Sequence, residues 1–318
     1  MEPPQTILEN LKDIDQYLAQ FHQSQQSMYF EQLIAEAFSY ILYLPYFTSD
    51  NENTNNLHRV TWQGSVNSVY RSPRGKPDAI AYCYDFNLII EATKNTGVNQ
   101  WAKEFAQAIR HCQDFCSQAC IQQKDTIVLL ICTKLHRDTY ISIKNNPKRE
   151  YKLIPIEASG LFKILETSIL AFTMRHLELR RLLNQISEYI KSSSSLDDFQ
   201  SAEHKLISNW QENVLKVEKN TFVGIKSYEA MCQTGRTNVS AGDILSILIK
   251  NPIVHQYFEI IHDKPSVSYI EEGLLGQSLG ILIGKTLKDE EPLFEPVHSA
   301  DFKARGKRLI EEAEKIYG

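Results

Sequence analysis

The sequence lacks any hydrophobic run long enough to cross a bilayer. No apolar stretch reaches the roughly 18 to 20 residues that a transmembrane helix needs. The first residues, MEPPQTILENLKDIDQ, contain no basic segment followed by an apolar one, so no signal peptide is visible. With 42% hydrophobic and 23% charged residues, the composition is that of an ordinary globular protein, and we expect a cytoplasmic one.

Cysteine is also scarce, with six residues in a chain of 318. The six cysteines lack the paired spacing of zinc ligands, and their density is too low for a secreted disulfide scaffold. Cys112, Cys116 and Cys120 recur at helical spacing beside His111, which is compatible with a metal cluster. Because the same helix face carries apolar residues, we interpret these cysteines as free thiols packed as small hydrophobic side chains.

An excess of positive charge is absent, since the net charge is -5. This value excludes a general polybasic coat for nucleic acid but leaves room for a local basic surface. Arg59, Arg71, Arg74 and Lys76 gather positive charge just before Asp78. They would suit a phosphate backbone passing that point, and a solvated run of charge explains them equally well.

The pattern of apolar residues in the first half predicts an α/β fold. Residues 79–84 and 86–93 read as a hairpin whose second strand is continuously apolar and therefore central. A long amphipathic helix over 99–120 leads to a buried strand at 126–135, and a short strand follows at 151–158. Strand, helix and strand after a hairpin describe a mixed β-sheet flanked by helices.

The serine run Ser192–Ser195 is the clearest linker in the chain. Before it, residues 161–190 are expected to be helical throughout. We therefore predict an α/β domain over residues 1–191 and an all-α domain over residues 197–318. In the second domain, Gly276, Gly280 and Gly284 are spaced by four, which indicates close packing of a soluble helix.

Two carboxylates dominate the hairpin region. Asp78 follows Pro77 at the start of the first strand, and Glu91 lies at the polar end of the second. Neighbouring strands can bring such residues together at the sheet edge, where they offer the oxygen ligands that magnesium prefers. This arrangement suggests metal-assisted hydrolysis of phosphodiester bonds.

The order Pro77-Asp78 and then Glu91-Ala92-Thr93 resembles the PD-(D/E)XK nuclease superfamily of restriction and repair enzymes. Thr93 stands where that superfamily usually has lysine. Lys94 is one residue further on and by strand alternation faces the other side of the sheet, unless a bulge re-aims it.

A narrower group of restriction endonucleases also has threonine at the position where the superfamily usually has lysine. The sequence is similar to AlwI-like and MlyI-like type IIS restriction endonucleases and their nicking relatives, which read PD, then E-V-T, then G-x-x-Q, E and H along the next helix. This chain has Pro77-Asp78, Glu91-Ala92-Thr93, Gly97, Gln100, Glu104 and His111 in that order, with Ala92 in place of valine. The match covers about forty residues.

The resemblance implies that Asp78, Glu91 and the backbone carbonyl of Ala92 ligate Mg²⁺. Lys94, through a bulge, or Lys103, from the helix, would replace the usual lysine, which stabilises charge on the nucleophile or the phosphorane.

Three further side chains are candidates for the site. Gln100 and Glu104 lie one turn apart on the next helix and could both face the metal edge, where Glu104 would support the first metal or bind a second. Glu31 lies at the edge of the apolar face of an earlier helix and could lean towards the site. An exposed polar side chain is the alternative for each of them.

These features predict a type II restriction endonuclease, in its narrower form type IIS, that cleaves double-stranded DNA with Mg²⁺. In this interpretation, residues 1–191 form the catalytic domain, and the helical domain over residues 197–318 recognises DNA or assists dimerisation. One site per chain implies a homodimer, a transient dimer or a second nuclease subunit for a double-strand break. The alternatives are a nicking subunit, a repair nuclease of the same superfamily, and a catalytically inactive DNA-binding protein.

Overall fold

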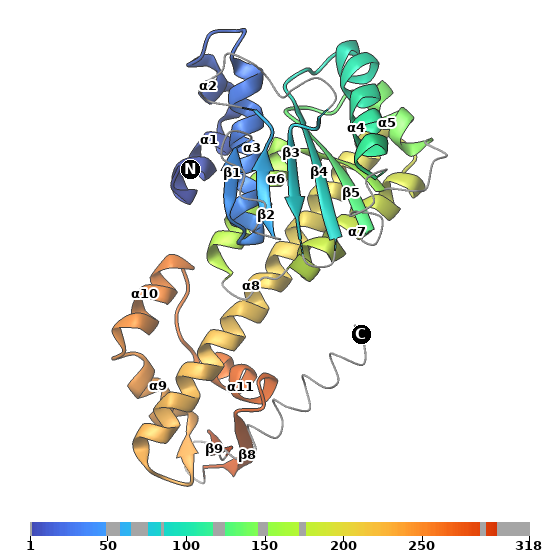
Figure 1. The fold of residues 1–318 in the computed structure, drawn as a ribbon. Helices are drawn as coiled ribbons and strands as arrows, with labels where there is room; N and C mark the ends of the chain where they lie inside the picture. Colours follow the sequence, from blue (N-terminus) through green and yellow to red (C-terminus); the bar gives the residue numbers. More distant parts are fainter. Residues whose placement is uncertain are drawn as a thin grey trace. The chain divides into compact units, whose positions relative to one another are not determined.

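The structure is a computed structural model that describes residues 2–48, 58–64, 76–83, 86–116, 125–145, 152–171, 176–286 and 291–297. The chain divides into two compact units, Met1–Asn213 and Val214–Gly318 (Figure 1). The expected turn near Tyr84 and Asp85, the basic residues Arg71 and Arg74, and the side chains of Cys112, Cys116 and Cys120 lie outside the described residues.

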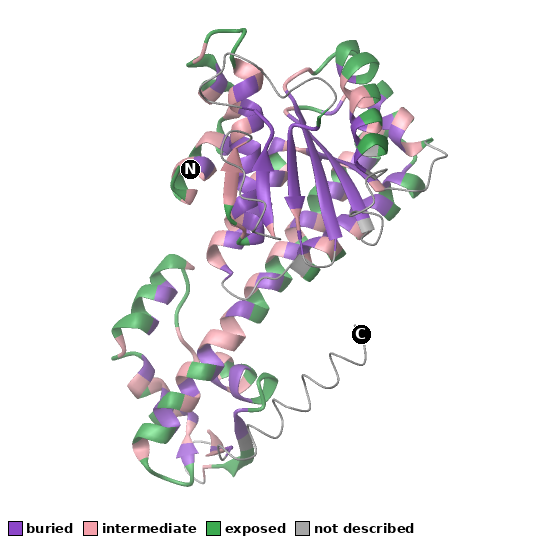
Figure 2. Cartoon of the chain, viewed as in Figure 1, coloured by how far each residue is buried: buried purple, intermediate pink, exposed green. Residues whose placement is uncertain are grey.

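A six-stranded mixed sheet forms the centre of the first unit, in the order β1-β2-β3-β4-β5-β6. β2 is parallel to β1 and antiparallel to β3, β3 is antiparallel to β4, and β4, β5 and β6 run parallel. The strands are β1 (Tyr46–Thr48), β2 (Arg59–Trp62), β3 (Ala79–Tyr82), β4 (Phe86–Thr93), β5 (Asp125–Cys132) and β6 (Lys152–Glu157). The hairpin and the two later strands were expected, and every residue of β4 is buried, as its apolar run predicted (Figure 2).

Helices cover both faces of this sheet. The chain moves from β4 to its neighbour β5 and then to the next strand, β6, in the same direction across the sheet. Because such parallel connections are right-handed, the helices of both crossovers lie on one face. Two other helices, α3 and α6, pack against each other and against the strands. The helices are α1 (Pro4–Lys12), α2 (Ile14–Ala19), α3 (Gln26–Leu42), the π-helix η1 (Gln100–Phe105), α4 (Ala106–Cys116), α5 (Arg137–Lys144), α6 (Ala158–Leu170), α7 (His176–Ser192) and α8 (Leu196–Thr234). The α/β fold is thus confirmed.

The expectation of one continuous helix over residues 161–190 was wrong. α6 ends at Leu170, where the C-cap residue Ala171 has an extended backbone with φ -108° and ψ 97°. α7 begins at His176. Both segments are amphipathic, so the helical pattern alone does not reveal the break between them.

The second unit is mainly helical, as expected, and also contains a small antiparallel sheet in the order β7-β9-β8. Beyond α8 its elements are β7 (Val239–Ser240), α9 (Ala241–Leu248), α10 (Pro252–Ile260), α11 (Val267–Gly276), β8 (Gly280–Lys285) and β9 (Pro292–Pro296). The prediction of one helix through Gly276, Gly280 and Gly284 was wrong, because the helix ends at Gly276. Gly284 instead lies at an irregularity in the pairing of β8 with β9.

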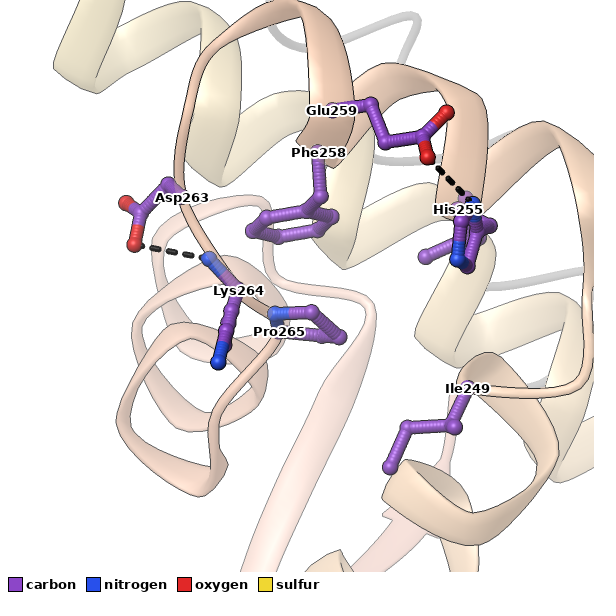
Figure 3. Close-up of a pocket in the computed structure, with 8 residues that line it drawn as sticks. Ile249, His255, Phe258, Glu259, Asp263, Lys264 and Pro265 are labelled. Carbon is purple, nitrogen blue, oxygen red and sulfur yellow. Dashed lines mark hydrogen bonds and ion pairs between the residues drawn. The ribbon is translucent and has the colours of Figure 1, made fainter.

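A cavity of about 370 Å³ also lies in the second unit, lined on one side by Phe258 and Pro265 (Figure 3). Its rim carries an ion pair of 3.5 Å between His255 Nδ1 and Glu259 Oε1. The side chain of Ile249 at this cavity is 56% exposed.

Among the helices in the described part of the chain, none combines the length and the apolar character required to cross a membrane. Cys83, Cys132 and Cys232 are free thiols, and the first two are buried.

Candidate active site

The two predicted carboxylates meet at one edge of the central sheet. In the antiparallel pair β3–β4, Ala79 lies opposite Ile90, so the same register continued by one residue sets Asp78 opposite Glu91. The backbone N–H of Ala92 donates to Asp78 Oδ2 at 2.8 Å. Both side chains are buried, with 9% of Asp78 and 4% of Glu91 exposed. The hairpin therefore presents two carboxylates from adjacent strands.

Glu91 lies in an acidic and poorly solvated environment. Burial raises its pKa well above the ordinary value, and the carboxylates of Glu104 and Glu31 raise it further. Since carboxylates close together resist simultaneous ionisation, this cluster favours the binding of a proton or a cation. Glu31 is only 6% exposed and comes from α3, so three separate elements contribute to the electrostatics at Glu91.

His111 contacts Glu91 directly. Its Nδ1 lies 2.6 Å from Glu91 Oε1, and the imidazole is 3% exposed. Burial and the adjacent Arg110 lower the pKa of His111, while Asp114 acts in the opposite direction. A neutral imidazole can donate its Nδ1–H to the carboxylate and so fix the orientation of Glu91.

Thr93 and Lys94 leave the strand in different directions. Thr93 is buried, and its Oγ1 accepts a hydrogen bond of 3.1 Å from the backbone N–H of Asn95. Lys94 is half-buried, and its Nζ donates to Oε1 of Gln26 at 2.7 Å, at the start of α3. Lys103, the other candidate for the lysine position, is exposed on η1.

Gln100 and Glu104 both form hydrogen bonds with the segment that follows β4. The Gln100 amide donates to the carbonyl oxygens of Asn95 at 2.6 Å and Lys134 at 2.9 Å, and it accepts from the N–H of His136 at 2.7 Å. Gln100 is fully buried. Its contacts are those of a residue that joins the turn after β4 to the turn after β5.

Glu104 accepts a hydrogen bond of 3.0 Å from Asn95 Nδ2. Asn95 thus contacts both helix residues of the motif, although it was not among the predicted site residues. The polar segment between β4 and the next helix was the available signal, because such connections after central strands often carry functional residues.

Of the basic residues ahead of Asp78, the structure describes Arg59 and Lys76, and these two differ in exposure. Arg59 is 9% exposed and its guanidinium lies 4.2 Å from the centre of the Tyr82 ring, within the sheet. Lys76 is exposed. Of the two, only Lys76 has the exposure expected of a phosphate contact.

The donors at this edge fit a magnesium ion of the kind that keeps several of its waters. Asp78 and Glu91 would supply carboxylate oxygens, and Ala92 would supply a backbone carbonyl. Within the ranges that the structure describes, no three His, Cys, Asp or Glu side chains form a metal-binding group. Mg²⁺ is commonly held by one or two carboxylates, with water and substrate phosphate completing its coordination, so two are sufficient.

Comparisons with known proteins place the chain in a family. No curated protein matches it. Among solved structures, the small subunit of the heterodimeric restriction endonuclease R.BspD6I is similar at 15% identity, with a TM-score of 0.46, over 66% of this chain and 99% of that one. The family model described as AlwI restriction endonuclease matches residues 3–164, just over half of the sequence. The matched region includes the carboxylate edge, and the chain belongs to the AlwI restriction endonuclease family.

Proposed function

We propose that this chain is a type II restriction endonuclease that hydrolyses phosphodiester bonds of double-stranded DNA with Mg²⁺, and that it cuts in the type IIS manner, beside its recognition sequence. The observation that carries the proposal is the pairing of Asp78 and Glu91 across adjacent strands at the edge of the sheet. Membership in the AlwI restriction endonuclease family supports the same activity.

In this proposal, Asp78, Glu91 and the carbonyl of Ala92 hold the ion. When bound, Mg²⁺ acts as a Lewis acid on the phosphate and promotes the ionisation of the attacking water. The N–H of Ala92 holds the Asp78 carboxylate in place, and His111 holds Glu91. These two hydrogen bonds organise the carboxylates before DNA arrives, which reduces the reorganisation that the reaction requires.

The role of the usual lysine falls to Lys94 in this proposal. Its Nζ currently donates to Gln26 on α3, so the ammonium would exchange an amide oxygen for a phosphate oxygen when DNA binds. Glu31 lies on the same helix and adds negative charge near Glu91, which strengthens the attraction for a cation. Glu104 and Gln100 then act through the Asn95 segment.

The test is cleavage of plasmid DNA by Asp78→Asn and Glu91→Gln, which keep the side-chain size and remove the charge. We expect each to lower the cleavage rate about a thousandfold or more, because metal binding supplies several kcal/mol of transition-state stabilisation. DNA binding, measured by fluorescence anisotropy with Ca²⁺, should persist. Glu9→Gln, an exposed carboxylate on α1, is the matched control.

The forms of the DNA product separate the alternatives. Discrete linear fragments whose ends lie at a fixed offset from a common sequence support type IIS cleavage, while open circles alone indicate a nicking subunit. Cleavage at DNA structures without sequence preference indicates a repair nuclease. Binding without cleavage by the unmodified chain, at any Mg²⁺ concentration, would identify an inactive DNA-binding protein.

A further inference from the structure

A cavity with two carboxylates in its lining lies in the first unit, between α6 and α8, which are labelled in Figure 1. Its volume is about 320 Å³. The polar groups around it come from the end of β6, the first turns of α6 and the first turns of α8, and they include Glu157, Ser159, Lys163, Ser201, Glu203 and His204.

Glu203 is the unusual member of this group. Its side chain is 5% exposed, and its Oε1 has no hydrogen-bond partner among the described residues. The backbone N–H of Glu157 donates to the Glu203 carboxylate, so only part of that carboxylate is satisfied by protein. A buried polar atom without a partner costs free energy, and it therefore indicates that a further group belongs in the cavity.

The charge around Glu203 favours a cation over an anion. The positive end of α6 begins at Glu157 and already faces the Glu203 carboxylate, which occupies the place where an anion would bind. Burial and the nearby Glu157 carboxylate raise the pKa of Glu203 to about 8, as expected where negative charge is crowded and poorly solvated.

The hydrogen bonds of the Lys163 ammonium go to partners other than the two carboxylates. Its Nζ lies 3.0 Å from His204 Nε2 and 3.0 Å from Ser208 Oγ, so its hydrogen bonds run along α8. When a bound cation keeps both carboxylates ionised, two carboxylates and one ammonium give the lining of the cavity a net negative charge. Glu157 Oε1 is occupied by the N–H of Leu135 at 2.9 Å and by Gln200 Nε2 at 2.6 Å.

We propose that this cavity binds a hydrated divalent cation, held by Glu203 Oε1 and Glu157 Oε2 and surrounded by the hydroxyl groups of Ser159 and Ser201. All of these donors are oxygen atoms, and an ion of the magnesium type binds through one or two carboxylates while it keeps several waters. The cavity has room for such a hydrated ion.

This site is separate from the catalytic carboxylates. Thr93 pairs with Cys132 and Cys132 pairs with Glu157, so Glu157 lies two strands away from the end of β4. Adjacent strands are about 4.8 Å apart, which separates Glu157 from Thr93 by roughly 10 Å. The two sites can therefore be tested independently.

The experiment measures Mn²⁺ binding to the full-length chain by electron paramagnetic resonance. In the Asp78→Asn/Glu91→Gln protein, whose catalytic carboxylates are neutral, we expect one bound Mn²⁺ per chain. Adding Glu203→Gln should abolish that binding, whereas adding Glu212→Gln, an exposed carboxylate on the same helix, should leave it unchanged.

A variant at the mouth of the cavity covers the case in which Glu203→Gln does not fold. Ser201 is exposed, so Ser201→Arg adds positive charge without disturbing the buried carboxylate, and it should weaken Mn²⁺ binding about tenfold or more. The proposal is overturned if the protein without catalytic carboxylates binds no Mn²⁺, or if its affinity is the same with Ser201→Arg or with folded Glu203→Gln.

Discussion

His111 is the residue whose contact most changes the view of the site. The family pattern implied a histidine two turns beyond Glu104, and the structure brings its Nδ1 to 2.6 Å from Glu91 Oε1. A histidine that orients a ligating carboxylate acts through that carboxylate, without touching the reacting phosphate. Such outer partners typically contribute 10-fold to 100-fold to metal affinity or activity.

We therefore expect His111→Ala to slow DNA cleavage about 10-fold to 100-fold and to raise the Mg²⁺ concentration needed for half-maximal rate. Single-turnover cleavage over a range of Mg²⁺ concentrations measures both effects. Gln113→Ala, exposed on the same helix, is the control. A His111→Ala protein with an unchanged rate and an unchanged Mg²⁺ dependence would show that the contact has no part in positioning Glu91.

At the scale of elements, Gln100 joins the start of η1 to the turns that follow β4 and β5. Its amide makes three hydrogen bonds in a fully buried position. Gln100→Leu keeps much of the volume and removes all three hydrogen bonds, so two carbonyl oxygens and one N–H lose this partner in a part-buried region. Since each loss costs about 1 kcal/mol or more, we expect a decrease of about 3 kcal/mol in the free energy of unfolding.

Urea denaturation followed by circular dichroism measures this change, with Gln113→Leu as the exposed control. A Gln100→Leu protein as stable as the parent would mean that these three bonds add nothing to the stability of the fold. If stability falls as expected while cleavage per folded molecule is normal, Gln100 serves the fold alone.

The elements best predicted from the sequence are those whose signal is local. The apolar run over residues 86–93 coincides with β4, because a strand buried on both faces needs no polar alternation. The segment from Gly276 to Gly284 misled the helical prediction, because its glycine spacing suits a helix while Ile281, Leu282 and Ile283 suit a strand. Pairing with β9, the next strand along the chain, decides that competition.

Contacts between distant segments were the part of the site that could not be predicted. The sequence placed Asp78 opposite Glu91 through a short hairpin, where register follows from the turn. The bond from Lys94 to Gln26 spans 68 positions and depends on how α3 packs against the sheet. No periodicity within either segment encodes that packing, so the surroundings of Lys94 required the structure.

At the scale of the whole molecule, the first compact unit extends into α8. The serine run Ser192–Ser195 separates α7 from α8, whereas the division between the units falls after Asn213. The segment between these points buries Phe199, Ile207 and Trp210, which are 0%, 1% and 7% exposed. Removing three such side chains costs on the order of 5 kcal/mol, which is comparable with the whole stability of a domain.

We therefore propose that a fragment of residues 1–213 folds cooperatively, and that a fragment of residues 1–191 does not. Thermal unfolding followed by circular dichroism distinguishes the two. A sharp transition in the shorter fragment would show that α8 is dispensable for the catalytic fold. If the folded fragment still cut with full sequence specificity, the proposed role of the second unit in DNA recognition would be wrong.

A double-strand break requires a second active site, and a mixing experiment shows where that site comes from. We expect two copies of this chain to act together, because a symmetric pair supplies two identical sites for two strands. With a fourfold excess of the inactive Asp78→Asn/Glu91→Gln chain, about four in five active chains pair with an inactive one, and such pairs cut only one strand. Gel electrophoresis of plasmid products should then show linear DNA replaced by open circles. If the active chain alone yields only open circles at every concentration, and the inactive chain leaves that pattern unaltered, the second site belongs to a different subunit.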